Sequence, residues 1–235
     1  YQKYENPAFQ SHLERFAVDE QTYQDGTFKQ FYAADALLSA GLEVLTASAS
    51  RSCGDMMGIP HHQDHLANCF VSARKGLKEG KGNLVTSWAV RHNHPELGHP
   101  ATFAAVYAKT NNRAFNEREI YEAFTLEYYG VNLPDFIEAA TKAQKGFRFA
   151  ERRGIEEAFQ KLQQKEDPVP SLIENLVVQF KGIENARAYF ANTIADYQSA
   201  YSIIEDMKSK VLKNTRNLDF WLEGIALQQF YAEFI

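Results

Sequence analysis

Cysteine is scarce in this sequence. The 235 residues include only 2 cysteines, Cys53 and Cys69, and these do not form a Cys-x-x-Cys motif. A disulfide framework is therefore excluded as the main source of stability, and a reducing compartment is favoured. We accordingly expect a cytoplasmic location. Because the chain begins with Tyr1 and not with Met, a secreted or processed form is kept as the alternative.

Long apolar runs and an excess of positive charge are also missing. No stretch of about eighteen consecutive apolar residues occurs, so the sequence predicts no membrane span. The formal net charge is -5, with 25 Lys and Arg against 30 Asp and Glu. This mildly acidic balance argues against nucleic-acid binding and against wholesale binding to an anionic membrane, although it is compatible with local basic patches.

Several catalytic signatures are absent as well. The sequence contains no glycine-rich phosphate loop, no dinucleotide-binding fingerprint and no Gly-x-Ser-x-Gly motif. No histidine follows His99, which argues against a di-iron site built from Glu-x-x-His motifs in a helical bundle. The candidate chemistry therefore lies with the histidines and cysteines of the first hundred residues.

The residues that are present have the composition of a folded domain, with 45% hydrophobic and 13% aromatic residues. Apolar residues at three- and four-residue steps predict helices over residues 27–41 and 61–78. The segment between them, 42–52, is compatible with a short strand or with a continuation of the first helix. Segments 83–90 and 101–108 are rich in β-branched and aromatic residues and predict two strands, joined by the loop RHNHPELGH.

The second half of the chain has helical patterns throughout. The motif NERE at residues 116–119 is typical of a capping box, in which Asn116 accepts from the Glu119 amide and Glu119 reaches back. A near-heptad apolar stripe over residues 183–212 predicts a long helix packed antiparallel in a bundle. An aromatic-rich helix is expected to follow from residue 218.

These patterns together predict an α+β fold that is predominantly α-helical. A small strand pair at about 83–110 is expected to pack with a C-terminal helical bundle. We expect a mixed α/β part, residues 1–112, to carry the candidate site. A helical part, residues 113–235, follows it, and the two are expected to form one continuous domain.

Six of the 7 histidines lie in two stretches, HHQDH and RHNHPELGH. His61 and His65 are four residues apart, so on a helix they share one face, a spacing by which histidine pairs hold zinc. His92, His94 and Glu96 alternate, so they would project on one side of an extended chain. Two such half-sites, meeting across the strand pair, would hold one divalent transition metal, Zn or Fe, with a position open for water. The alternative is that these histidines are solvated surface groups.

A thiol enzyme explains the same region differently. Cys53 lies in the small-residue turn SRSCGD, where the N–H groups of a helical turn would stabilise a thiolate. His99 directly precedes the predicted strand 101–108, and Asn112 (or Asn111) follows it. Nucleophile, base and orienting group then occur in the chain order that papain-like hydrolases use. Cys69 is the alternative nucleophile, but it falls mid-helix on an apolar face, where a buried and inert cysteine is the default expectation. The alternative is two structural cysteines and an ordinary loop histidine.

Both interpretations predict a hydrolase or group-transfer enzyme with a histidine-rich site. They differ in the nucleophile, which is either a metal-bound water or a cysteine thiolate, and His99 is the base or a ligand in each. The substrate is unspecified, and a protein is one option. The competing interpretation is a non-catalytic protein in which the C-terminal helices form an interaction or homo-oligomer surface and the histidines have no joint role.

Overall fold

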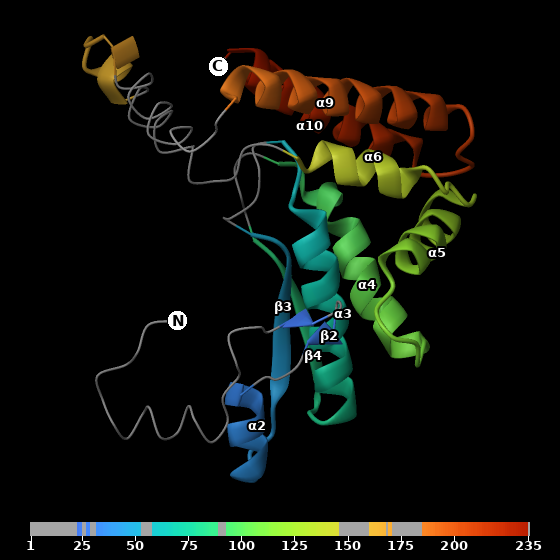
Figure 1. Ribbon diagram of the computed structural model, residues 1–235. Helices are drawn as coiled ribbons and strands as arrows, with labels where there is room; N and C mark the ends of the chain where they lie inside the picture. Colours follow the sequence, from blue (N-terminus) through green and yellow to red (C-terminus); the bar gives the residue numbers. More distant parts are fainter. Residues whose placement is uncertain are drawn as a thin grey trace. The chain divides into compact units, whose positions relative to one another are not determined.

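The fold is given by a computed structural model, and Figure 1 labels its elements. The structure describes residues 23–24, 27–28, 32–52, 58–88, 93–145, 160–167, 169–170 and 185–234. The strands are β1 (Tyr23–Gln24), β2 (Thr27–Phe28), β3 (Leu45–Arg51) and β4 (Gly82–Ser87). The helices are α2 (Tyr32–Ser39), α3 (His62–Lys78), η1 (Pro95–Gly98), α4 (His99–Thr110), α5 (Glu117–Tyr129), α6 (Phe136–Ala143), α9 (Ala186–Lys208) and α10 (Thr215–Phe234).

The chain packs as two compact units, each assembled from three stretches of sequence. Unit 1 comprises Tyr1–Ser50, Gln63–Thr86 and Pro100–Ile120, and unit 2 comprises Arg51–His62, Ser87–His99 and Tyr121–Ile235. Both units draw on residues from each side of residue 112. A domain boundary at that position stays a prediction.

Strands β3 and β4 form a two-stranded parallel sheet, and α3 connects them. Lys81 N donates to Val44 O at 2.7 Å and Trp88 N donates to Arg51 O at 3.4 Å, with the same sequence separation in both pairs. A constant separation means that the strands run parallel, and a parallel pair requires a crossover element such as α3. The predicted fold class, predominantly helical with a small strand pair, is confirmed.

One of the two predicted strands is wrong. The segment 83–90 contains β4 as expected, but 101–108 lies within α4, and the partner of β4 is β3. The segment 101–108 has buried alanines at i, i+3, i+4 and i+7, which is the helical period: Ala101, Ala104, Ala105 and Ala108. Alanine has the highest helix propensity, so this alanine spacing outweighs the β-branched and aromatic residues between them.

In unit 1, α3 packs on β3 through small and polar side chains. β3 buries Thr46, Ser48 and Ser50, and Thr46 Oγ1 donates to Ser72 O of α3 at 2.7 Å. Gly76 permits this close approach, because a Cβ at that position would lie 2.3 Å from Thr46 Oγ1. The apolar face of α3 completes the core with Leu66, Cys69, Phe70 and Ala73. The helix predicted over residues 61–78 is confirmed as α3.

The core of unit 2 is aromatic. Phe124 and Tyr129 of α5, Phe136 of α6 and Trp221 of α10 are all fully buried. Phe136 meets Trp221 edge to face, with ring centroids 5.1 Å apart, and Phe124 meets Tyr129 in the same way at 5.7 Å. Edge-to-face pairs of this kind add stability beyond the area they bury.

Helix α9 packs against both α6 and α10, as the ribbon shows (Figure 1). Tyr197, Ala200, Ile204 and Met207 of α9 are buried at three- and four-residue steps. The long helix predicted from the stripe over residues 183–212 and the aromatic-rich helix expected from residue 218 are thus confirmed as α9 and α10. No helix in the described part of the chain is long and apolar enough to cross a membrane.

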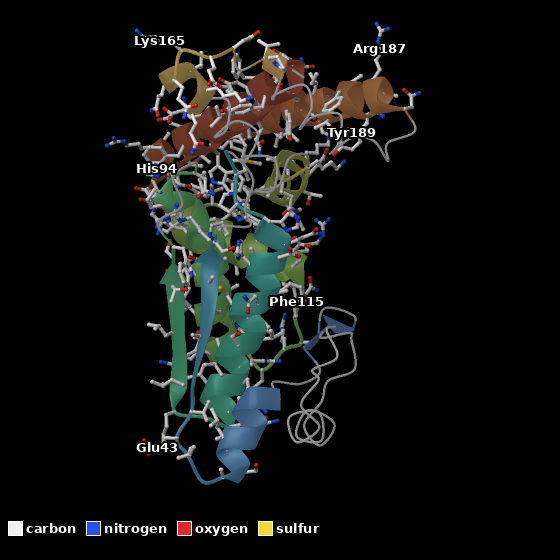
Figure 2. The ribbon with its side chains drawn as sticks, turned by 90° about the vertical axis from the view of Figure 1, so that its left-hand side faces the viewer. Glu43, His94, Phe115, Lys165, Arg187 and Tyr189 are labelled. Carbon is white, nitrogen blue, oxygen red and sulfur yellow. The ribbon has the colours of Figure 1, made fainter. Side chains whose placement is uncertain are left out.

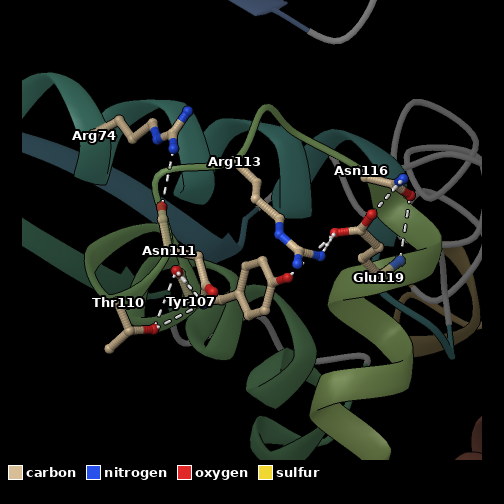
Figure 3. Close-up of polar contacts among 7 residues, drawn as sticks. All are labelled: Arg74, Tyr107, Thr110, Asn111, Arg113, Asn116 and Glu119. Atoms are coloured by element: carbon tan, nitrogen blue, oxygen red, sulfur yellow. Dashed lines mark hydrogen bonds and ion pairs between the residues drawn. The ribbon is translucent and has the colours of Figure 1, made fainter.

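The predicted capping box precedes α5. Asn116 Oδ1 accepts from the Glu119 amide at 3.2 Å, as expected. Asn116 Nδ2 also donates to Glu119 Oε1 at 3.3 Å, so the return bond joins two side chains (Figure 3). The local sequence therefore fixes where this helix begins.

The loop before α3 meets α10 through two glycines of unit 2. A Cβ on Gly224, in the middle of α10, would lie 2.5 Å from Gly58 O and 2.7 Å from Ile59 Cδ1. Helix propensity alone would make Gly224→Ala stabilising by up to about 1 kcal/mol. The forced contact opposes this gain, because overpacking a well-packed site typically costs about 1–3 kcal/mol.

We therefore expect Gly224→Ala to lower the free energy of unfolding by about 1–2 kcal/mol net, measured by denaturant unfolding. Ala226→Gly, at an exposed position two residues further along α10, serves as the matched control and should cost only the propensity difference of about 1 kcal/mol or less. A Gly224→Ala protein that is more stable than the wild type would contradict the close contact.

Candidate functional site

The segment 93–99 folds into the short turn η1, which leads directly into α4. His94, labelled in Figure 2, caps η1 because its Nδ1 accepts from the Glu96 amide at 3.3 Å. Pro95 suits the first position of the turn, where its missing N–H would have no partner. The sequence analysis predicted that His99 stands before a strand, but His99 is the first residue of helix α4. Pro100 fits the first turn of that helix.

Asn217 holds η1 against the rest of unit 2. Its Nδ2 donates to Glu96 Oε2 at 3.3 Å and to Glu96 O at 3.4 Å. Its Oδ1 accepts from the Tyr129 hydroxyl at 2.5 Å. Asn217 is only 2% exposed, so both ends of this buried amide are satisfied by fixed partners.

His99 forms a pair with Tyr128 of α5. Its Nδ1 lies 2.9 Å from the Tyr128 hydroxyl, and the two rings meet edge to face with centroids 5.3 Å apart. Burial lowers the pKa of the half-buried His99 below the ordinary 6.5, the Glu96 carboxylate raises it, and His94 lowers it further. The net direction is downward, so the neutral imidazole predominates at neutral pH.

The proton between His99 and Tyr128 has two arrangements. Burial and the Glu96 carboxylate raise the pKa of Tyr128, so its phenol stays neutral near pH 7. Either the phenol donates to Nδ1, or Nδ1–H donates to the phenol oxygen. In the second arrangement Nε2 carries the lone pair and can accept a proton from a reacting group. A neutral imidazole held in a fixed orientation is what a general base requires.

The residues before His99 are fixed by an arginine and by a stacked ring. Arg51 Nη1 donates to Asn93 O at 2.8 Å and to Asn93 Oδ1 at 2.9 Å, while its Nε donates to Ser87 Oγ at 2.9 Å. The His94 ring stacks on Phe220 of α10 with centroids 3.5 Å apart and an angle of 9°. These contacts orient the polar atoms of the segment before any ligand arrives.

A cavity of about 360 Å³ lies beside this segment in unit 2. Asn93, His94 and Leu97 line it together with Phe220, Glu223 and Leu227 of α10. The buried Asn93 Nδ2, on the cavity wall, makes no hydrogen bond within the described residues. The cavity thus offers an amide donor, a carboxylate and a stacked aromatic wall to a small group, although His99 is not among its lining residues.

The candidate metal ligands occupy different surroundings. His65 Nδ1 lies 2.8 Å from Ala49 O, so this histidine helps to join α3 to β3 within unit 1. His61 is half-buried just before α3, and His94 and Glu96 belong to η1 and its cap. His92 lies outside the described residues. Across the described ranges, no three or more His, Cys, Asp or Glu side chains are grouped so as to hold a metal ion.

Of the candidate thiol residues, the structure describes His99, Asn112 and Cys69. Cys53 lies outside the described residues. His99 is the first residue of the twelve-residue helix α4, which is about 18 Å long, and Asn112 is exposed beyond its C-terminal end, so these two residues are not in contact. Cys69 is fully buried, and burial raises the pKa of its thiol to about 11, as expected for an inert cysteine.

Sequence reasoning missed the residues that position His99 and Glu96. Tyr128 and Asn217 lie far from the histidine clusters in sequence, and no motif marks them. The pair of tyrosines in EYYG, at the C-terminal end of α5, is a local feature that could have drawn attention to Tyr128. No protein-family model, curated protein or solved structure matches the chain.

The lowered pKa of His99 is directly measurable by NMR titration of its ring protons. We expect a value below 6.5. Glu96→Gln keeps an acceptor for Asn217 but removes the negative charge, so it should lower the pKa of His99 further. His94→Gln removes the electrostatic effect by which His94 lowers the pKa of His99, so it should raise that pKa. A wild-type pKa at or above 6.5 would contradict the desolvated site.

The same shift predicts how stability depends on pH. Between its folded-state pKa and 6.5, His99 binds a proton in the unfolded chain but not in the folded one. Its contribution to the free energy of unfolding is therefore present above pH 6.5 and is lost as the pH falls through the folded-state pKa. His99→Gln should flatten this part of the stability profile.

Proposed function

We propose that the protein is a hydrolase or group-transfer enzyme in which His99 is the general base. The observation that carries this proposal is the His99–Tyr128 pair, in which Nδ1 and the phenol oxygen are 2.9 Å apart. Tyr128 takes the orienting role that the sequence assigned to Asn112. His99 removes a proton at Nε2 while Nδ1–H donates to the phenol oxygen.

The charges around His99 suit a base that gains and then returns a proton. The Glu96 carboxylate raises the pKa of His99, which means that it stabilises the imidazolium form. Burial is the larger influence and lowers the pKa of His99, so the neutral form predominates before the reaction. Asn217 keeps the carboxylate in place.

Two nucleophiles are compatible with this base. In the first version, His99 takes the proton of the Cys53 thiol, the thiolate attacks the substrate carbonyl carbon, and the protonated histidine returns the proton to the leaving group. In the second version, the nucleophile would be water on a divalent Zn or Fe. The sequence offers His61, His65, His92, His94 and Glu96 as ligands, but the described members of this set are not grouped so as to hold a metal ion. The substrate class is the same in both versions, an acyl or similarly activated group, with a protein as one option.

A helical interaction surface is the second candidate function. Leu227 and Phe230 of α10 are one turn apart and are 37% and 60% exposed. Tyr189, near the start of α9 and labelled in Figure 2, is also exposed. Exposed apolar side chains on adjacent helices favour a protein partner or a second copy of this chain.

The catalytic proposal predicts multiple-turnover hydrolysis of p-nitrophenyl acetate. His99→Ala should reduce kcat/KM by about 100-fold or more, and Tyr128→Phe by a smaller factor, because it removes only the orienting bond. The acidic limb of the pH–rate profile should have its midpoint below 6.5, following the lowered pKa of His99. His12→Ala, a histidine that neither version uses, is the matched control. Full turnover by His99→Ala would refute the proposed base.

Cysteine labelling separates the two nucleophiles. At pH 7.5 a thiol with a pKa of about 11 is ionised to only about 0.03%, so Cys69 should react with iodoacetamide more than about 100-fold slower than an unperturbed thiol. The thiol version predicts rapid labelling that Cys53→Ser abolishes and His99→Ala slows. The metal version predicts slow labelling throughout and uptake of about one equivalent of Zn or Fe on titration. If neither rapid labelling nor metal uptake is observed, and neither variant changes turnover, the helical interaction surface remains as the function.

A further inference from the structure

We propose that a cavity of unit 1, at the C-terminal ends of α3 and α4, binds a phosphate group of a small anionic ligand. The cavity has a volume of about 480 Å³ and is lined by Arg74, Leu77, Lys78, Ala108, Lys109 and Asn112. Three of these side chains are cationic, and no carboxylate stands among the described residues that line the cavity. The cavity is therefore a local excess of positive charge in a chain whose net charge is -5.

The two lysines differ from other cations of unit 1. Lys81 pairs with Glu43 at 3.0 Å, Arg113 pairs with Glu119 at 3.2 Å, and Lys75 also pairs with a carboxylate. Lys78 and Lys109 form no ion pair within the described part of the chain. Their charges are therefore available to an incoming anion, whereas the neighbouring cations are already neutralised locally.

Protein contacts orient the side chain of Arg74 at the wall of the cavity. Its Nη2 donates to Asn111 O at 2.9 Å (Figure 3), and its guanidinium lies 5.0 Å from the centre of the Phe70 ring. Phe70 is buried and meets Phe115 edge to face, so this platform is rigid. One guanidinium edge is thus fixed by protein contacts, and the remaining N–H groups keep the planar fork that suits phosphate oxygens.

Helix ends account for part of this arrangement but not for all of it. Lys78 and Lys109 lie in the last turns of α3 and α4, where the helix dipole favours cations. Arg74, however, is one turn earlier and four residues from Lys78, a like-charge spacing that destabilises a helix by a few tenths of a kcal/mol. A dianionic phosphate between the three cations relieves that repulsion. Asn112 adds an amide to the rim of the same cavity.

This inference is independent of the proposed catalytic function, because none of its residues acts in the His99 mechanism. The probe is inorganic phosphate, titrated into the full chain by isothermal calorimetry at low ionic strength. We expect saturable binding at one site with a dissociation constant in the millimolar range. Acetate, with one charge and no tetrahedral oxygens, should bind at least about fivefold more weakly.

Lysine variants test whether the cavity is the site. Lys78→Gln and Lys109→Gln should each weaken phosphate binding by about fivefold, and the double variant should abolish it, whereas Lys78→Arg should retain it. Lys81→Gln makes the same charge change in unit 1 outside the cavity and should leave binding unchanged. Circular dichroism melting of each variant separates lost binding from lost folding.

Three outcomes would overturn the proposal. The first is the absence of saturable binding up to about 20 mM phosphate, a concentration above the millimolar dissociation constant expected for three charge-assisted contacts. The second is an equal loss of affinity in Lys81→Gln, which would mean that only the overall charge matters. The third is equal binding of acetate and phosphate, which would mean that the cavity does not select the phosphate group.

Discussion

The buried amide of Asn217 is the contact on which the candidate site depends. It accepts from the Tyr129 hydroxyl and donates to both the side chain and the main chain of Glu96, so it joins α5, α10 and η1 at one point. Asn214, just before α10, adds a bond from its Nδ2 to Tyr128 O at 2.6 Å. Since η1 ends directly before His99, the geometry that fixes Glu96 also fixes where His99 meets Tyr128. Losing this amide would leave buried donors and acceptors without partners, which typically costs about 1–3 kcal/mol for each group.

Burial has opposite chemical consequences at the two kinds of titratable group. At His99 it favours the neutral imidazole, the form that can accept a proton, and the nearby Glu96 carboxylate limits the shift. At Cys69 burial also favours the neutral form, but a neutral thiol is a poor nucleophile. A hydrogen bond with Ser48 lowers the pKa of this thiol, but by less than burial raises it. The same physical effect therefore supports a reactive role for one residue and removes the other from consideration. The difference lies in which protonation state carries the reactivity.

Local periodicity correctly predicted the three longest helices of the described residues. The stripes that became α3, α9 and α10 repeat at three- and four-residue steps, and the Asn116–Glu119 capping box marks the start of α5. The error at residues 101–108 came from reading Thr102, Phe103 and Val106 as strand formers. The four buried alanines of that segment follow the helical period, and their small side chains let α4 pack closely. His99 was identified as the central residue, but its position at a strand start was wrong.

The sequence by itself determined the helical elements and the clustering of histidines near His99, because both depend on residues close together along the chain. Only the tertiary structure decided what those histidines contact. Tyr128 is 29 residues from His99, and Asn217 is 121 residues from Glu96. Hydrogen bonds across such separations form only after the helices have packed, so no local pattern specifies them. Packing likewise assigned His65 to the junction of α3 with β3, and His94 to a stacked pair with Phe220, although the two belong to the same kind of sequence cluster.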